Sequence, residues 1–351
     1  MKIHAIHFVL ATVLIMSCNK NANTTMPGPT KEKWVVTTVA GDGLAHFSDG
    51  PALTAGFKAP QDVTVTPDGN IYVADAINHR IRKLTANVVT TYAGSGIEDT
   101  TGGPGGVAAF AFPIQLTTDL AGNLYTLDID DFRIRKISSS ALVTVVAGNG
   151  ERGFADGSVA DAEFGETTGI VADNQGNIYV SDNENKRIRK INTAGWVTTI
   201  AGNGKAAYVN GQADKAEFFS PTGIVIDKQQ NLFVADYNHI RKITPDGIVS
   251  TFAGNDSLGY RDGQANVARF NFINDVVMDD AGNIYVTDDN RIREISPQGN
   301  VSTIAGSTAG YSDGDSASAK FNNPVGLGID SNGNIYVADD NNNRIRKISF
   351  E

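Results

Sequence analysis

The sequence predicts an all-β fold, a six-bladed β-propeller with four-stranded antiparallel blades. Short runs of β-branched and aromatic residues recur along the chain, and turn residues such as glycine and asparagine bound them. The clearest run occurs six times, and successive copies are 51 to 54 residues apart. A repeat of roughly 50 residues with four short strands is typical of one propeller blade. Length alone would suggest about two or three domains, but the repeats predict a single domain over residues 34–351.

The clearest run is the expected second strand of each unit, which reads Asn-Ile-Tyr-Val-Ala-Asp in its fullest form. An apolar run such as Val63–Val65 precedes it and predicts the first strand. The join between them, residues 67–70 in the first unit, holds residues that accept the positive φ of a tight hairpin. A basic run such as Arg80–Leu84 predicts the third strand. The six second strands begin at Asn70, Asn123, Asn177, Asn231, Asn283 and Asn334.

The expected fourth strand reads Val-Thr-Thr-x-Ala-Gly in its fullest form and also occurs six times. The first copy, Trp34–Gly41, precedes any first strand, and the last unit, which ends at Phe350, has no copy of its own. We therefore expect the N-terminal strand to complete the last blade as its outermost strand. Such a closure removes the free sheet edges that invite aggregation.

These motifs resemble NHL repeats. The resemblance rests on Asn78-His79-Arg80-Ile81 and on the repeated Gly-Asn-Ile-Tyr-Val-Ala-Asp, and it covers residues 34–351. It implies a propeller fold. It implies less about function, because the family includes RNA-binding modules, an amidating lyase, sensor domains and extracellular protein-interaction modules, and one fold supports many activities.

The N-terminus predicts export and a lipid anchor. Residues 1–17 read as a signal peptide, and the apolar run Phe8–Met16 is too short to cross a membrane core of about 30 Å as a helix. Leu14–Cys18 resembles a bacterial lipobox, which implies cleavage before Cys18 and lipidation of that residue. An ordinary signal peptide with an incidental cysteine is the alternative. Residues 18–33 are polar and predict a flexible tether. We expect a location in the bacterial cell envelope, on the periplasmic or surface side of the outer membrane, with membrane contact only through the lipid.

Two charged residues recur in every unit, an aspartate that closes the second strand and an arginine in the third. Six identical copies do not describe one catalytic site. Because both faces of a blade are buried, we expect each aspartate to pair with an arginine and to stabilise the fold. The pairs involve Asp75, Asp128, Asp182, Asp236, Asp288 and Asp339, with Arg82, Arg135, Arg189, Arg241, Arg293 and Arg346.

The connectors between units carry an aromatic residue, one spacer and then Asp-Gly or Asn-Gly, followed by a second aromatic such as Phe57. We expect these rings to anchor the connectors to the blades, the alternative being a ring of ligand-stacking aromatics. The second unit lacks the Asp-Gly turn and reads Thr100–Gly106 at this place. This departure predicts a notch beside Asp130, Asp131 and Phe132.

The candidate ligand-binding residues lie on the face that carries the connectors, the top face. At the mouth of the central channel three units have glycine, whereas the others have Asp62, Gln115 and Asp275. Together with Asp130, Asp131 and His79 these residues form the predicted site; simple solvation of a water-filled channel is the alternative. A calcium ion at Asp130 and Asp131 stays open, although no EF-hand spacing supports it.

The charge and the motifs of the chain exclude several classes of function. The formal charge is −10, and the six loops between second and third strands hold eleven acids and one lysine, which argues against nucleic acid. Beyond residue 17, His46, His79 and His239 are the histidines, and they lie in connectors or loops rather than in the channel, as a zinc lyase would need. The sequence contains no P-loop or HExxH motif. We expect a monomeric, non-catalytic module for an envelope protein or glycan. The alternative is a metal-dependent lyase or hydrolase at the channel mouth, for instance one that uses Asp62 and Asp275 as paired carboxylates.

Overall fold

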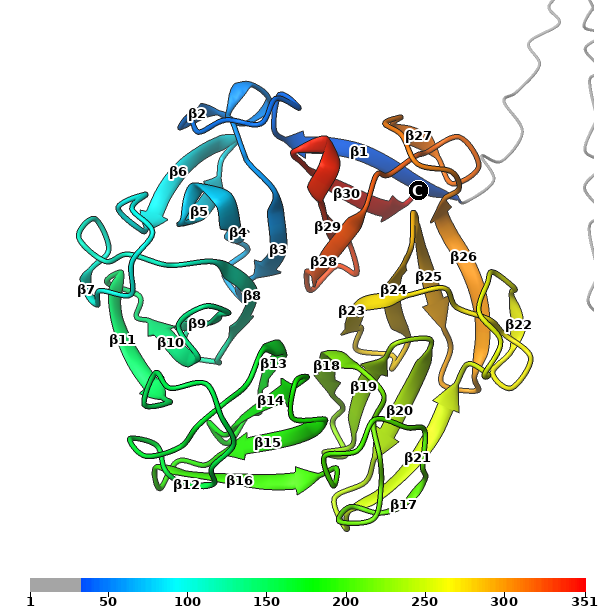
Figure 1. Cartoon of the computed structure of the whole chain (residues 1–351). Coiled ribbons are helices and arrows are strands. Elements are labelled where there is room, and N and C mark those ends of the chain that lie inside the picture. The colour runs from blue at the N-terminus through cyan, green and yellow to red at the C-terminus, as the bar shows by residue number, and fades with distance from the viewer. Residues whose placement is uncertain (1–32) are drawn as a thin grey trace, which may run out of the picture. The chain divides into compact units, whose positions relative to one another are not determined.

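The computed structural model describes residues 33–351, and these form six antiparallel sheets around a central axis (Figure 1). The predicted signal peptide, Cys18 and nearly all of the tether lie outside the described residues. Within the described part, no helix is long and apolar enough to cross a membrane. The all-β, six-bladed propeller is thus confirmed.

Four strands of each blade follow the four predicted runs. The innermost strands are β3 (Pro60–Val65), β8 (Pro113–Thr118), β13 (Thr167–Ala172), β18 (Pro221–Ile226), β23 (Ile273–Met278) and β28 (Pro324–Ile329). The second strands are β4 (Ile71–Asp75), β9 (Leu124–Asp128), β14 (Ile178–Asp182), β19 (Leu232–Asp236), β24 (Ile284–Asp288) and β29 (Ile335–Asp339). The third strands are β5 (Arg80–Thr85), β10 (Arg133–Ile137), β15 (Arg187–Ile191), β20 (His239–Ile243), β25 (Arg291–Ile295) and β30 (Arg344–Phe350). The fourth strands are β6 (Val88–Ala93), β11 (Leu142–Ala147), β16 (Trp196–Ala201), β21 (Ile248–Ala253), β26 (Asn300–Gly306) and β1 (Trp34–Ala40).

Each sheet has a fifth strand, so the expectation of four-stranded blades is wrong. This outermost strand is two residues long and comes from the connector: β2 (Gly50–Pro51), β7 (Gly103–Pro104), β12 (Gly157–Ser158), β17 (Gly211–Gln212), β22 (Gly263–Gln264) and β27 (Gly314–Asp315). The connector can reach the sheet edge because its glycine adopts a positive φ, +151° at Gly157 and +141° at Gly211. The extra strand covers part of an otherwise free edge.

The N-terminal strand β1 joins the last blade, but in fourth place. It pairs antiparallel with β30, from Trp34 opposite Phe350 to Ala40 opposite Ile345, and the short β27 lies outside it. The expectation that β1 is the outermost strand is therefore wrong. We number the blades 1 to 6 from the sheet that contains β3 to the sheet that contains β28.

The hydrophobic core consists of six clusters, each between two neighbouring blades. In one of them Tyr72 and Ala74 of blade 1 pack with Leu116 of blade 2 and with Phe110 from the intervening connector. A phenylalanine at this connector position is fully buried in every blade, and burial of such a ring stabilises the fold by about 2 kcal/mol. The second connector aromatic is thus an anchor, as expected: Phe57, Phe110, Phe164, Phe218, Phe270 and Phe321.

The first connector aromatic packs on arginines of the third strand. Phe47 lies with its ring 3.9 Å from the guanidinium carbon of Arg80 and 4.8 Å from that of Arg82. In blade 4 a histidine takes the place of the first arginine, and Tyr208 packs against His239 with the ring centroids 4.2 Å apart. These rings are therefore engaged within their own blades.

Candidate functional site

The top face has a cavity of about 320 Å³ on the central axis, and residues from all six blades line it. Six of them occupy the second position of an innermost strand, which is the position directly before the predicted channel residues. The loops between second and third strands add Ile129 and Asn183. The lining residues are Gln61, Phe112, Ile114, Gln115, Ile129, Thr168, Asn183, Ser220, Thr222, Phe272, Asn274 and Val325.

This top-face cavity has a polar and an apolar side but no charged lining. Phe112, Ile114 and Ile129 of blade 2 form an apolar wall, to which Phe272 of blade 5 adds a second ring. Amide and hydroxyl groups supply the polar part, and Asn183 is held in place by hydrogen bonds to Ser220 Oγ at 3.0 Å and to the carbonyl oxygen of Pro221 at 2.9 Å. None of the lining residues is Asp, Glu, Lys, Arg or His. Because a buried charge without a partner is costly, the cavity favours an uncharged group.

The three predicted channel residues come together below this cavity. Gln115 lines both the top-face cavity and a second cavity of about 210 Å³, deeper in the channel, whereas Asp62 and Asp275 line only the deeper one. Both carboxylates are almost fully buried, with residue exposures of 1% and 4%. Asp62 and Asp275 thus lie inside the channel and not at its mouth.

Each carboxylate bridges two innermost strands. Asp62 accepts a hydrogen bond from its neighbour Val63 N at 2.7 Å and one from Leu116 N of the next blade, also at 2.7 Å. Asp275 accepts one from Leu327 N of the next blade at 2.8 Å. Inner strands have no further strand on their channel side, so these carboxylates satisfy main-chain donors that would otherwise stay unpaired. Their first role is structural.

Burial makes these two carboxyl groups weak acids. Burial and the neighbouring charge of Asp275 raise the pKa of Asp62 well above its usual range, against the hydrogen bonds from Leu116 and Val63. Burial raises the pKa of Asp275 to about 7. The pair therefore retains at least one proton near neutral pH, because burial and the charge of one carboxylate both oppose ionisation of the other.

The glycines of the channel ring make room for these carboxylates. A Cβ atom on Gly223 would lie 2.6 Å from Asp275 Oδ1, and one on Gly326 would lie 2.5 Å from Asp62 Cα. Neither glycine has a positive φ, so close packing and not backbone conformation requires it. The glycines and the acids of this ring are thus complementary features of one packing arrangement.

The other predicted site residues lie away from both channel cavities. Asp131 is buried and pairs with Arg133 and with Arg135, the latter at 3.0 Å, so its carboxylate already has two cationic partners. Asp130 is exposed. His79 lies with Nδ1 2.6 Å from the carbonyl oxygen of Ala111, in the next blade, and donates to it from this nitrogen. A calcium ion held by Asp130 and Asp131 would have to displace the two arginines.

The buried Asp–Arg pairs are confirmed, and blade 2 shows how the arginine is paired where the connector lacks the Asp-Gly turn. In blade 1, Arg82 binds Asp75 at 2.6 Å and the connector's Asp49 at 2.6 Å. In blade 2, Asp131 replaces the connector acid, and Asp128 lies 3.7 Å from Arg135. The predicted notch is therefore the place where a second acid comes from a loop instead of from the connector.

Sequence reasoning identified the channel ring but missed most of the top-face cavity. The missed residues stand one position before the channel ring, as Thr168 does before Gly169 and Asn274 before Asp275. Because successive side chains of a strand point in opposite directions, this position could have been predicted to line a different surface from the ring itself. Within residues 33–351 there is no group of three or more His, Cys, Asp or Glu side chains placed to hold a metal ion.

Known proteins support the fold. Residues 57–84, 164–191 and 321–348 match the NHL repeat family, and residues 209–261 match the teneurin NHL domain. Human NHL repeat-containing protein 2 is 29% identical over 328 residues, which cover 86% of this chain and 40% of that protein. The chain thus spans less than half the length of this curated relative.

Solved structures of other proteins have a similar fold. A protein of unknown function from Bacteroides thetaiotaomicron has a TM-score of 0.71 and 21% identity, with 92% of this chain and 77% of that chain covered. A protein named as an auxiliary nutrient binding protein, from the same organism, has a TM-score of 0.69 and 17% identity over the same shares. Identities this low show the fold alone. The chain thus contains segments that match NHL repeats, and residues 33–351 fold as a six-bladed β-propeller.

Proposed function

We propose that this protein is a non-catalytic binding module of the bacterial cell envelope, anchored through a lipid on Cys18, which binds a protein or glycan as a monomer. The observation that carries the proposal is the top-face cavity, which six blades build together and which contains amides, hydroxyls and two phenylalanines but no charge. A concave, mostly preformed site with a few polar groups is typical of ligand binding. An uncharged part of the ligand, such as a sugar ring or an uncharged side chain, fits this lining.

Lack of acid–base groups in this cavity favours binding over catalysis. General acid–base chemistry needs a titratable group within reach of the ligand, and Gln115 at the cavity floor cannot supply a proton. The solved relative named as an auxiliary nutrient binding protein shares the fold. Because propellers host many functions, the ligand class is inferred from the cavity itself.

The alternative function is a metal-dependent lyase or hydrolase in the channel, and the buried pair Asp62 and Asp275 is the observation that favours it. Against it, these carboxylates are occupied by main-chain donors, and Gln115 separates them from the top-face cavity. Metal analysis of the purified full chain distinguishes the two proposals. A stoichiometric, tightly held metal would favour the enzyme.

Affinity capture tests the binding proposal. The full chain is used to capture ligands from a cell-envelope extract, in parallel with Val325→Phe, which fills the top-face cavity. Val145→Phe is the matched control, because Val145 lies on the outer strand β11 and is half exposed. We expect the captured set to be lost with Val325→Phe and kept with Val145→Phe. An unchanged set with Val325→Phe would refute the proposed site.

A further inference from the structure

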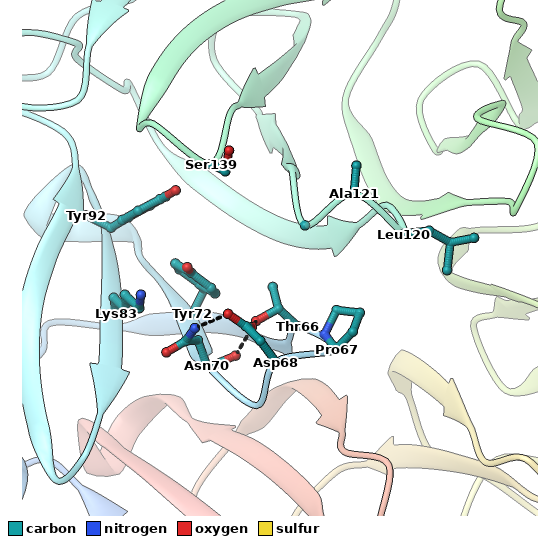
Figure 2. Close-up of a pocket in the computed structure, with 11 residues that line it drawn as sticks. Thr66, Pro67, Asp68, Asn70, Tyr72, Lys83, Tyr92, Leu120, Ala121 and Ser139 are labelled. Carbon is teal, nitrogen blue, oxygen red and sulfur yellow. Dashed lines mark hydrogen bonds between the residues drawn. The ribbon is translucent and has the colours of Figure 1, made fainter.

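A third pocket opens on the bottom face, where the turns between first and second strands lie. It has a volume of about 320 Å³ and lies between blades 1 and 2 (Figure 2). The turn of residues 66–70 and the strands β4, β5 and β6 form one side, and residues 120–122 and Ser139 of blade 2 form the other. None of its lining residues belongs to the top-face cavity, so it is independent of the function proposed above.

This pocket exists where blade 1 departs from the repeat. In the other five blades the turn begins with aspartate, namely Asp119, Asp173, Asp227, Asp279 and Asp330, whereas blade 1 has Thr66. In blade 2, Asp119 accepts the hydroxyl of Tyr125 at 3.0 Å and interacts favourably with Lys136.

The equivalent donors of blade 1 are Tyr72 and Lys83, and both line the pocket without this carboxylate. The ion pairs of blade 1 are those of His46 and Arg82, and Lys83 takes part in none of them. Its ammonium lies 5.6 Å from the centre of the Tyr72 ring. The Lys83 ammonium is thus available to a ligand at the place where blade 2 has its own acceptor, whereas the Tyr72 hydroxyl interacts with that of Tyr92.

The same pocket holds one ionised acceptor. Asp68 accepts hydrogen bonds from Thr66 Oγ1 at 2.5 Å and from Asn70 Nδ2 at 2.6 Å, and the hydrogen bond from Thr66 is the main cause of its lowered pKa. Asp68 and Lys83 balance in charge, so the pocket favours an uncharged ligand that donates to one and accepts from the other.

Apolar surface surrounds these polar groups. Tyr72 and Tyr92 meet edge to face, with ring centroids 4.8 Å apart, and Figure 2 shows both rings on the side of Lys83. Across the pocket lies Leu120, whose 77% exposure is the highest of the large apolar residues in residues 33–351. A ligand with an apolar face would cover Leu120 and gain hydrophobic free energy.

We infer that this bottom-face pocket binds a pyranose unit of a neutral glycan. A sugar hydroxyl both donates and accepts, and adjacent hydroxyls present the two functions on the same side of the ring. A trans peptide group points its N–H and C=O to opposite sides, which suits Asp68 and Lys83 in one pocket less well. The C–H face of the ring would lie against Leu120 and the tyrosines.

The test uses saturation-transfer NMR and calorimetry on the full chain, with neutral oligosaccharides of glucose, galactose and mannose, uronic-acid oligosaccharides and uncharged peptides as probes. We expect binding of at least one neutral oligosaccharide. Thr66→Asp restores the turn of the other blades and gives Tyr72 and Lys83 an internal acceptor, so affinity falls about tenfold. If this variant is less stable than the wild type, Thr66→Asp with Asp68→Ala reproduces the polar pattern of the blade 2 turn and serves instead.

Matched variants separate this pocket from other surfaces. Lys83→Met weakens binding, whereas Lys136→Met, the same change at the equivalent position of blade 2, leaves it unchanged. Val325→Phe also leaves it unchanged, which distinguishes failure of this inference from failure of the proposed top-face function. Absence of binding to every neutral oligosaccharide, tighter binding of uronic acids or peptides, or equal affinity of Thr66→Asp would each overturn the inference.

Discussion

Asp131 Oδ2 lies 3.0 Å from Nη1 of Arg135, in the one blade whose connector has neither the Asp-Gly nor the Asn-Gly turn that contacts this arginine in the other blades. Arg135 is fully buried, so it needs compensating charge from some part of the chain. The acid that sequence inspection suggests as a ligand is in fact a substitute for a missing structural partner. A departure from the repeat in the connector is thus matched by a second departure in a loop.

This relationship predicts that the adjacent residues Asp131 and Asp130 contribute very differently to stability. Asp131→Ala leaves Arg135 with Asp128 alone, at 3.7 Å, and should lower the free energy of unfolding by about 3 kcal/mol. Asp130→Ala, one position earlier and exposed, should change it by less than about 0.5 kcal/mol. Urea unfolding followed by circular dichroism measures both. Equal effects of the two variants would contradict the compensation.

The repeated pairs should be essential to the fold. Arg189 binds Asp182 at 2.9 Å with both side chains fully buried. Asp182→Ala leaves that guanidinium with one half-exposed acid, Asp156, and should cost about 3–5 kcal/mol. Thermal unfolding of the purified variant checks this. A melting temperature equal to that of the wild type would refute a structural role for the pair.

The carboxyl pair of the channel predicts a pH dependence of stability. The folded protein retains protons on Asp62 and Asp275 that the unfolded chain releases near its ordinary pKa of about 4. The stability that these protons contribute is fully present below about pH 4 and is lost as the pH rises toward 7. The free energy of unfolding falls by about 1.4 kcal/mol per pH unit for each proton that the folded protein retains and the unfolded chain has released. Denaturant unfolding between pH 5 and 8 should therefore show a smaller dependence of the unfolding free energy on pH for Asp275→Asn than for the wild type, and identical dependences would contradict the raised pKa of Asp275.

The glycines of the channel ring should not tolerate a methyl group. Gly326→Ala places Cβ 2.5 Å from Asp62 Cα and should destabilise the fold by about 2 kcal/mol. Gly106→Ala is the control, because no atom lies within 4 Å of its Cβ position. Differential scanning calorimetry compares the two variants. A Gly326→Ala protein as stable as the control would show that the ring is looser than the structure indicates.

Lipidation of Cys18 is a prediction from the sequence, because the residue lies outside the described part of the chain. Cells that express the full chain should incorporate an alkyne-labelled palmitate into the protein, and Cys18→Ala should abolish the label. Lack of label on the wild type would remove the anchor from the proposed function.

Repeats made most of the fold predictable. Six copies of Asn-Ile-Tyr-Val-Ala-Asp and its variants specify blade number, strand order and the buried Asp–Arg pairs, because each copy must satisfy the same local chemistry. The fifth strand escaped prediction since two residues, such as Gly157 and Ser158, carry no strand pattern. Their pairing depends on a glycine φ and on the edge that β16 offers.

The site was harder to predict than the fold. Asp62 and Asp275 stand out as acids in a glycine ring, but their burial follows from how closely the blades approach, which no single strand reveals. Thr66 and Tyr72 attract little attention alone. They matter because five other turns have aspartate, and because that aspartate accepts a tyrosine hydroxyl in four of them.

The most direct test of the central claim is the equilibrium affinity of the captured envelope ligand for the wild type and for Val325→Phe, measured by calorimetry, with Val145→Phe as the control. Binding through the top-face cavity predicts that Val325→Phe binds at least about tenfold more weakly, a loss of about 1.4 kcal/mol, and that the control binds like the wild type. Equal affinities of the wild type and Val325→Phe would contradict the account.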